Sequence, residues 1–325
     1  MNYNFKNLVF EGGGMKGLAY VGALEVLQEK GIYAQIERVA GASAGAIMAL
    51  LLGLNYSPED LRGLFWSLCF KDFLDDSWGI VRDGRRLLFD YGWYKGERLR
   101  DFVARLIEQH TGTRHCTFAQ WEQLRAKKHF RELYIVGSNL STGFSEIFSA
   151  QHTPHLRIAD ALRISMSIPL FFAAQRNARG DVYVDGGLLD NYPLHLFDQP
   201  PFWSAEENGA PPYNPHTLGF RLDAGQRIAA FRHRAAPPRR DIRHFFDYTR
   251  ALFEALLTQQ DNRHLHSDDW QRTIYIDTLG VRTTDFDIDE GTKRGLIESG
   301  KRHTRQYFDW YDQPRKTEKT RPTSL

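Results

Sequence analysis

Cysteine is scarce in this sequence of 325 residues, with only Cys69 and Cys116 present. Two cysteines cannot build the disulfide framework of a small secreted protein, and they fit a reducing cytosol. Neither lies in a CxxC or cysteine–histidine spacing of the kind that binds structural zinc. The sequence therefore predicts no metal site.

Long hydrophobic runs are also absent. The N-terminal stretch MNYNFKNLVFEGGG has no basic segment followed by a long apolar one, so it does not indicate a secretory signal. No run of 18 apolar residues occurs, so we expect no membrane-spanning helix, although the chain can still lie against a membrane. These features predict a cytoplasmic location, and an effector exported by a specialised secretion system would share them.

The sequence has no marked excess of either charge, since it contains 42 lysines and arginines and 40 aspartates and glutamates. Dedicated nucleic-acid-binding proteins normally carry a marked basic excess, so this balance argues against nucleic acid as a partner. Hydrophobic residues make up 42% of the chain, which is enough for a sizeable core. No change in composition divides the chain cleanly into two domains.

The first fifty residues alternate between strand and helix patterns. NLVFEGGG is typical of a short apolar strand that ends in glycines, and GLAYVGALEVLQEKG has apolar residues at helical spacing up to Gly31. IERVAG then predicts a second strand and AGAIMALLLGL a buried helix. This alternation predicts an α/β fold with a parallel sheet and right-handed crossovers.

The rest of the chain continues this alternation less regularly. We expect helices at 96–112, 244–257 and about 290–311, a helix that runs into a turn at Pro169, and strands at ELYIVGSNL, DVYVDGG and TIYIDT. The proline-rich stretch 200–216 is typical of a surface loop. The aromatic-rich stretch 65–94 favours a helical subdomain that packs its own aromatics, or a cap that meets lipid or a substrate tail.

The stretch GASAG places Ser43 midway between two glycines and fits the G-x-S-x-G pattern of nucleophilic serines. Such a serine projects from a tight strand-to-helix turn, across which side chains at Gly41 and Gly45 would collide. The helix after the turn points its positive end at Ser43 and favours developing negative charge. The pattern alone is weak, but a strand before it and a helix after it are both predicted here.

A nucleophilic serine also needs backbone amides that stabilise an oxyanion. The loop FEGGGMKG follows the first strand, and its consecutive Gly12, Gly13 and Gly14 free the backbone to turn amides inward. In a parallel sheet this loop and the Ser43 loop emerge at the same edge. The loop also satisfies a bare GxGxxG pattern, but it lacks a clean acidic ribose ligand and the GK[ST] ending of a phosphate-binding loop.

Two residues compete to accept the proton of Ser43. Ser43, Asp185 and His195 have the chain order of an α/β-hydrolase triad, although the gap of ten residues between Asp185 and His195 fits that fold poorly. Alternatively Asp185 acts directly, despite an ordinary pKa of about 4, if it is buried and bonded to the serine hydroxyl. Asp-Gly-Gly is also a common β-turn, so the residues alone leave these possibilities open.

Three blocks, FEGGGMKGLAYVGAL, GASAGA and DGGLLDNYP, occur in an order that resembles the patatin-like phospholipases, and ISMSIPLFF resembles a fourth block. The resemblance reaches from about residue 7 to residue 193. It implies a three-layer α/β/α sandwich with a central, mostly parallel sheet. We expect one catalytic domain over 1–313, with a cap-like insertion near 65–94 and, from its composition, a disordered tail at 314–325.

The resemblance also implies the chemistry. By this resemblance Ser43 is the nucleophile and Asp185 is the base of a dyad without a catalytic histidine. Lys16 stands where the family has a positively charged residue. Gly12, Gly13 and Gly14 then line the oxyanion hole. The supporting residues are Lys16, Gly17, Gly41, Gly45, Gly186 and Gly187.

The implied reaction is hydrolysis of fatty acyl esters of phospholipids or lysophospholipids through an acyl-enzyme. It needs neither calcium nor another cofactor, and a bilayer substrate implies peripheral contact with a membrane. The alternative from another class is a catalytically silent lipid-binding module on the same scaffold. The intact serine, glycines and aspartate argue against that alternative.

Overall fold

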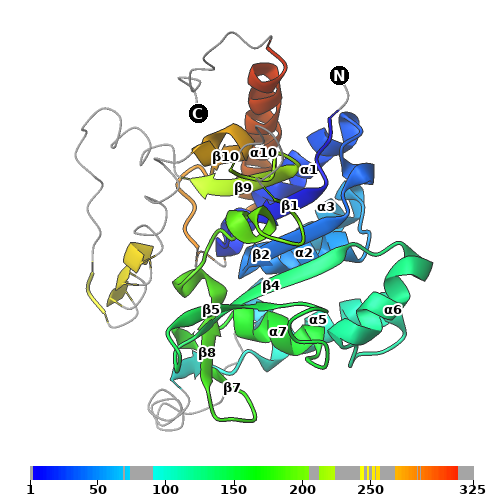
Figure 1. Ribbon diagram of the computed structural model, residues 1–325. Helices are drawn as coiled ribbons and strands as arrows, with labels where there is room; N and C mark the ends of the chain where they lie inside the picture. The colour runs from blue at the N-terminus through cyan, green and yellow to red at the C-terminus, as the bar shows by residue number, and fades with distance from the viewer. Residues whose placement is uncertain are drawn as a thin grey trace.

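The structure is a computed structural model, and it describes residues 3–68, 70–73, 91–204, 212–223, 242–244, 247–248, 251–252, 254–256, 268–283, 285 and 287–313. Its first elements are β1 (Asn7–Phe10), the 3-10 turn η1 (Gly14–Leu18), α1 (Ala19–Glu29), β2 (Arg38–Ala42) and α2 (Ala44–Gly53). The strand–helix alternation predicted for the first fifty residues is therefore confirmed (Figure 1).

A sheet of eight described strands forms the centre of the molecule. Its strands are hydrogen-bonded in the sequence β10 (Thr273–Asp277), β9 (Thr217–Asp223), β1, β2, β4 (Glu132–Asn139), β8 (Val182–Asp185) and β7 (Gln175–Arg176), and β5 (Phe144–Phe148) also pairs with β4. The strands from β10 to β4 are parallel, whereas β5, β8 and β7 are antiparallel to their neighbours. The sheet is mostly parallel, as predicted, with an antiparallel group at one end.

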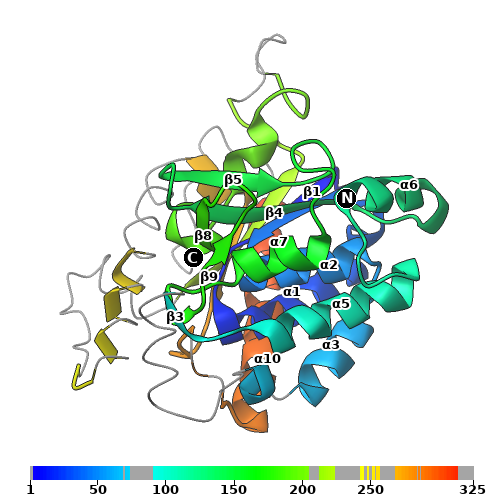
Figure 2. The same ribbon diagram turned by 90° about the horizontal axis from the view of Figure 1, so that it is seen from below.

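Both faces of the sheet are buried because successive strand residues point into different clusters. On β1, Leu8 and Phe10 join the large core beneath the helices, while Val9 joins a smaller cluster on the opposite face. Helices α1, α2, α7 (Ile158–Ser165) and α10 (Glu290–Tyr311) cover the first face (Figure 2).

The opposite face has a thinner cover. The smaller cluster there includes Tyr192, Leu194 and Phe197, from the 3-10 turn η5 (Leu194–Asp198) and its approach. Within the described residues, the third layer of the sandwich is thus made of short turns rather than long helices.

Local sequence signals explain where several helices begin. Ser57 and Asp60 form a capping box at α3 (Pro58–Ser67), and Thr117 and Gln120 form another at α6 (Phe118–Lys128). The sequence analysis did not predict these two helices, although their caps are legible in the sequence. Helix α5 (Glu97–Thr111) and helix α10 lie where helical periodicity predicted them.

Several sequence predictions fall on residues that the structure describes only in part. Residues 74–90, which hold most of the aromatic-rich stretch, and the tail 314–325 lie outside the described residues. The last residues of the stretch form β3 (Gly92–Tyr94), which pairs with β6 (Leu170–Phe172). Of the helix expected at 244–257, the described residues 247–248, 251–252 and 254–256 are helical.

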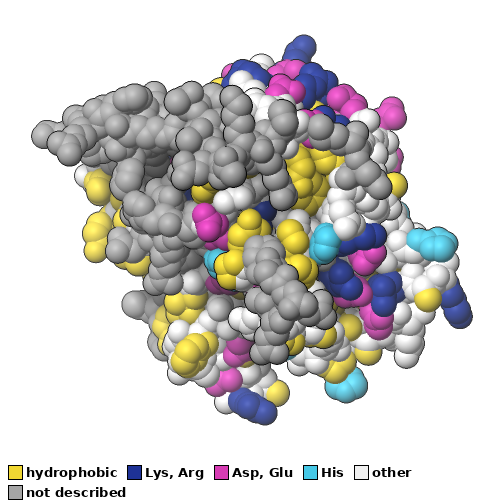
Figure 3. All heavy atoms as spheres, turned by 45° about the horizontal axis from the view of Figure 1, so that its top comes forward, with side chains coloured by type: hydrophobic (Ala, Val, Ile, Leu, Met, Phe, Trp, Pro, Cys, Tyr) yellow, Lys and Arg dark blue, Asp and Glu magenta, His cyan; other side chains and the backbone are white. Residues whose placement is uncertain are grey.

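Two observations on the described residues bear on a membrane or a nucleic acid as a partner. In the described part of the chain, no helix combines the length and the apolar character needed to cross a bilayer. On the face drawn in Figure 3, acidic and basic side chains lie among one another. That mixture agrees with the balanced composition of the sequence.

Candidate active site

Strand β4 brings two distant strand ends together. On one edge of β4, the parallel strand β2 pairs as far as Ala42, which lies opposite Val136. The antiparallel strand β8 ends on that same edge, with Asp185 opposite Gly137, because β5 occupies the other edge. The ends of β2 and β8 therefore meet head-on, and Ser43, which follows β2, lies beside Asp185.

Ser43 occupies the sharp turn between β2 and α2. Its φ of 52° lies in the left-handed region that non-glycine residues rarely adopt. Such strain costs about 1–3 kcal/mol and persists only where the surroundings enforce it. Here the amide of Ser43 donates to Ser165 Oγ at 2.9 Å, and its carbonyl accepts from the amide of Ala46 at 2.9 Å. The strand–turn–helix context predicted for Ser43 is present.

Gly41 and Gly45 leave no room for side chains at this turn. A Cβ added to Gly41 would lie 2.3 Å from the carbonyl carbon of Gly45, and one added to Gly45 would lie 2.3 Å from the carbonyl oxygen of Phe10. For Gly41 the predicted collision across the turn is therefore confirmed. Gly45 instead faces the end of β1, and the absence of a side chain there lets α2 pack directly on that strand.

The side chains of Ser43 and Asp185 are hydrogen-bonded. Ser43 Oγ donates to Asp185 Oδ2 at 2.7 Å, and the Asp185 side chain is fully buried. Burial raises the pKa of Asp185 from its ordinary value to about 7, although the hydrogen bonds from Ser43 and Gly187 act in the opposite direction. The pair thus couples a hydroxyl to a carboxyl group of unusually high proton affinity.

The turn after β8 fixes the orientation of the Asp185 carboxyl group. The amide of Gly187 donates to Asp185 Oδ1 at 2.7 Å, so the second oxygen is left to face Ser43. The amide of Asp185 donates to the carbonyl of Ser167 at 2.8 Å. Gly186 has no space for a side chain, since an added Cβ would lie 2.2 Å from the carbonyl oxygen of Val136.

The glycine-rich loop after β1 borders Ser43. A Cβ added to Gly12 would lie 3.1 Å from the Cβ of Ser43. The amide of Gly12 donates to the carbonyl of Asn191 at 3.0 Å, so the protein itself takes up this amide. No described residue accepts a hydrogen bond from the amide of Gly13 or Gly14. Of the three predicted oxyanion donors, Gly13 and Gly14 therefore differ from Gly12, whose amide is bonded within the protein.

Lys16 and Gly17 lie in η1, directly after the loop. The Lys16 side chain folds back along the loop, since a Cβ added to Gly13 would lie 3.2 Å from Lys16 Cε. Gly17 faces α2 at ordinary contact distance, with an added Cβ 3.6 Å from the Cβ of Ala44. Lys16 therefore packs along the loop, whereas a side-chain carbon at Gly17 would fit against α2 at ordinary contact distance.

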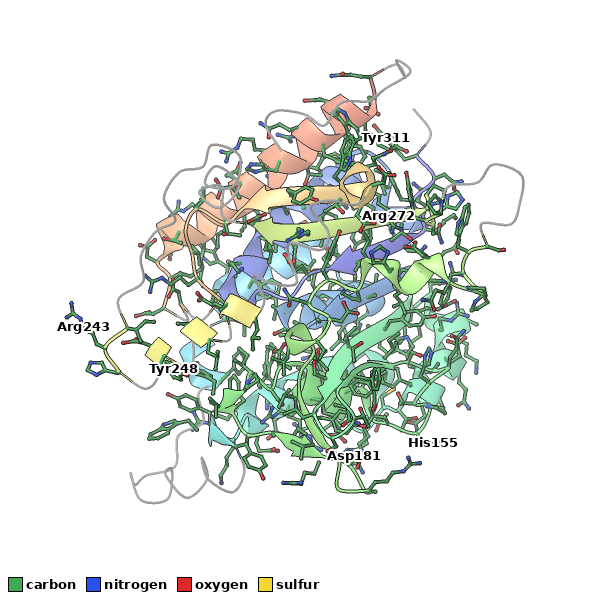
Figure 4. The ribbon with its side chains drawn as sticks, turned by 60° about the vertical axis from the view of Figure 1, so that its left-hand side comes forward. His155, Asp181, Arg243, Tyr248, Arg272 and Tyr311 are labelled. Atoms are coloured by element: carbon green, nitrogen blue, oxygen red, sulfur yellow. The ribbon has the colours of Figure 1, made fainter. Side chains whose placement is uncertain are left out.

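His195 does not take part in the Ser43–Asp185 contact. Its Nδ1 lies 2.9 Å from Asp198 Oδ2, and its Nε2 lies 3.1 Å from Asp269 Oδ2. Hydrogen bonds to these two carboxylates raise the pKa of His195 to about 9. Both carboxylates also pair with Arg272, which precedes β10 and is labelled in Figure 4. The histidine thus belongs to an ion-pair cluster between η5 and β10.

Three buried polar residues that the sequence analysis did not single out tie the site together. Ser165 accepts from the amide of Ser43, Asn191 Nδ2 donates to the Gly12 carbonyl at 3.2 Å, and Ser138 Oγ donates to the Gly186 carbonyl at 3.2 Å. Asn191 and Ser165 lie in the blocks DGGLLDNYP and ISMSIPLFF, so those blocks were the only available signal. Ser138 lies in a strand without any such signal.

Metal ligation has no candidate in this part of the fold. Among all the residues that the structure describes, no group of three or more histidine, cysteine, aspartate or glutamate side chains is arranged to hold a metal ion. The chemistry that the site offers is that of a hydroxyl, a carboxyl group and backbone amides.

Comparisons with known proteins identify the relatives of this chain. The family model described as patatin-like phospholipase matches residues 8–198. The Bacillus subtilis protein YqhO is 30% identical over 313 residues, which are 92% of this chain and 97% of that protein. A probable lipid hydrolase, 463L, of invertebrate iridescent virus 6 is 27% identical, and the match covers 59% of this chain and 63% of the viral protein. A cGAMP-activated phospholipase of Pseudomonas aeruginosa is also 27% identical, over 57% of this chain and 53% of its own.

Two solved structures share the fold. VipD from Legionella pneumophila superposes with a TM-score of 0.64 at 19% identity, covering 95% of this chain and 67% of VipD. ExoU, in its heterodimeric complex with SpcU from the type III secretion system of Pseudomonas aeruginosa, gives a TM-score of 0.53 at 22% identity. That match covers 95% of this chain but 52% of the ExoU chain, so the present chain spans about half the length of that neighbour.

Proposed function

The chain belongs to the patatin-like phospholipase family, a family of lipid hydrolases, and from that premise we propose that it cleaves fatty acyl esters of phospholipids or lysophospholipids. Ser43 is the nucleophile and Asp185 the base. The observation that carries the proposal is the 2.7 Å hydrogen bond from the strained Ser43 to a fully buried carboxyl group. The names of two relatives, a probable lipid hydrolase and a phospholipase, support the substrate class.

The first half of the reaction forms an acyl-enzyme. Ser43 Oγ attacks the ester carbonyl while its proton moves to Asp185 Oδ2, along the hydrogen bond that already joins them. The negative charge on the former carbonyl oxygen faces the amides of Gly13 and Gly14. Collapse of this intermediate expels the alcohol, which takes the proton from Asp185, and leaves the fatty acyl group on Ser43.

The second half releases the fatty acid. Asp185, ionised again, takes a proton from a water molecule as that water attacks the acyl carbonyl. The tetrahedral intermediate collapses, Ser43 leaves as the alkoxide, and the proton on Asp185 returns to it. An aspartate serves in this role because burial brings its pKa to about 7, close to the pH at which a general base works best.

This mechanism predicts the pH dependence of the reaction. Asp185 must be ionised in the free enzyme, so kcat/KM should rise with pH through an apparent pKa of about 7 and level off above it. The measurement is a pH–rate profile on one soluble short-chain acyl ester. A rise centred on the ordinary aspartate pKa of about 4 would contradict the assignment.

The same shift predicts how stability depends on pH. The folded-state pKa of Asp185 lies above its unfolded value of about 4, so its contribution to stability is complete below pH 4. That contribution is lost as the pH rises through 7, because the unfolded state ionises freely and the buried site does not. Between pH 5 and pH 8 the free energy of unfolding, measured with denaturant, should therefore fall more in the wild type than in Asp185→Asn.

Contact with a membrane follows if the substrate is a bilayer lipid. Phe144 and Leu140, at the turn between β4 and β5, have side chains that are 72% and 48% exposed. Exposed apolar side chains of this kind are suited to the interfacial region of a lipid surface. Of the tryptophans in the aromatic-rich stretch, Trp93 lies in β3, whereas Trp78 lies outside the described residues.

Lipid profiling tests the proposed function directly. The wild-type protein is incubated with a mixed phospholipid and lysophospholipid extract, and released fatty acids are identified by mass spectrometry. The blank is protein treated beforehand with a fluorophosphonate, and peptide mapping then locates the label. We expect fatty acid release from the untreated protein alone, and a label on Ser43. Folded protein that neither releases fatty acid nor accepts the label would favour a silent lipid-binding module.

A further inference from the structure

The end of α7 and the turn that follows it contact the backbone of both residues in the proposed dyad. Ser165 Oγ accepts the amide hydrogen of Ser43 at 2.9 Å, and the Ser167 carbonyl accepts the amide hydrogen of Asp185 at 2.8 Å. Ser43 and Asp185 are 142 residues apart in the sequence, yet one segment of three residues bonds to both. The relative position of the two therefore depends on this segment.

The polarity of the Ser165 hydroxyl is fixed. It donates its hydrogen to the Val136 carbonyl at 2.6 Å, because a carbonyl oxygen can only accept. Its lone pair is thereby left to face the amide of Ser43. Ser165 is completely buried, so bulk solvent does not reach this position to accept the hydrogen bond from the Ser43 amide in its place.

Ser167 is held from a second side. Arg163 Nη1 donates to Ser167 Oγ at 2.6 Å, and Arg163 Nη2 donates to the carbonyl of Ala173 at 2.9 Å and to that of Lys95. Arg163 is itself 1% exposed, so these bonds are shielded from water. The turn that carries Ser165 is therefore anchored to α5's entry and to the segment after β6.

The strain at Ser43 gives the Ser165 bond its importance. A serine at a φ of 52° must be held in that conformation by its surroundings, and its peptide group sets the direction of its Oγ. The bond to Ser165 holds the nitrogen end of that residue, while the first turn of α2 holds the carbonyl end. Without the hydroxyl, the buried amide has no described acceptor and the turn is free to shift.

We propose that Ser165 is a positioning residue for the proposed hydrolysis, which holds the Ser43 amide and thereby aims Ser43 Oγ at Asp185. This inference rests on the proposed function, because it concerns the same nucleophile. Ser165 touches neither substrate nor the transferred proton. Its effect is on the geometry of attack, and displacements of about 1 Å in such geometry lower rates by about 100-fold.

The test compares Ser165→Ala with the wild type on a soluble acyl ester and with a fluorophosphonate. We expect kcat to fall by about 10- to 100-fold with KM changed by less than about two-fold, since the interaction matters for attack rather than for binding. The rate of fluorophosphonate labelling should fall by a similar factor. The acidic limb of the pH profile should move to higher pH, because a loosened Ser43 stabilises the ionised carboxylate less well.

Ser299→Ala is the matched control. Ser299 is also completely buried, and its Oγ also donates to a backbone carbonyl at 2.6 Å, that of Asp277, but it lies on α10 away from the dyad. It should lose stability comparably and keep the wild-type kcat and pH profile. An equal loss of kcat in both variants would overturn the inference, since it would reflect a general loss of stability.

A second variant guards against a failure of Ser165→Ala to fold. Ser165→Cys keeps a hydrogen-bonding group at this place but offers a weaker acceptor, so its labelling rate should lie below that of the wild type. Wild-type kcat, labelling rate and pH profile in a folded Ser165 variant would overturn the positioning role and leave the hydrolase function standing. A wild type that neither labels nor hydrolyses would overturn both.

Discussion

Replacing the proposed base, in Asp185→Asn, is expected to lower kcat for fatty acid release by about 10³- to 10⁴-fold while the protein stays folded. An amide can occupy the same space and keep the hydrogen bond from Gly187, but it cannot accept the proton of Ser43. Ser43→Ala should be at least as damaging, and the double variant should be no worse than either single one, because the two residues act as a unit. Steady-state kinetics on a soluble ester would measure all three.

His195→Ala is the control that separates the dyad from a Ser43–Asp185–His195 triad. Both ring nitrogens of His195 are bonded to Asp198 and Asp269, so its removal should change kcat by less than about three-fold. Arg272 stays in place to balance the two carboxylates, so the fold should tolerate the loss. The opposite pattern, with an active Asp185→Asn and an inactive His195→Ala, would identify the histidine as the base.

The parts of this fold that the sequence predicts are those with a local cause. The alternation of strand and helix in the first fifty residues and the extent of α10 follow from periodicity, and the glycines around Ser43 follow from the sterics of one turn. These features depend on neighbours a few residues away. The sequence of that neighbourhood is therefore sufficient to predict them.

The parts that it does not predict have a distant cause. Strand β8 places Asp185 beside Ser43 because β8 runs antiparallel along the same edge of β4 on which β2 ends. The stretch DVYVDGG contains no signal for that register. The capture of the Gly12 amide by Asn191 likewise depends on packing between separate loops. Ser165 lies in the block ISMSIPLFF, but that block does not indicate the contact between Ser165 and Ser43, which forms where α7 meets the Ser43 turn.

Gly45→Ala is expected to lower the stability of the protein strongly. The added methyl carbon would lie 2.3 Å from the carbonyl oxygen of Phe10 and 2.8 Å from that of Glu11, both of them backbone atoms at the end of β1. Backbone atoms in a sheet cannot rotate away as a side chain can, so α2 must move. We expect the free energy of unfolding to fall by about 3 kcal/mol, at the upper end of ordinary overpacking effects. Urea denaturation followed by circular dichroism would measure this change.

The matched control is Gly63→Ala, which makes the same substitution inside a helix where nothing lies within 4 Å of the added Cβ. There the higher helix propensity of alanine should raise the free energy of unfolding by about 0.5–1 kcal/mol. Gly45→Ala should also lose activity beyond its loss of stability, because a displaced α2 moves Ser43 relative to the Gly13 and Gly14 amides. A Gly45→Ala protein as stable and active as Gly63→Ala would mean that α2 and β1 do not pack as closely as this geometry requires.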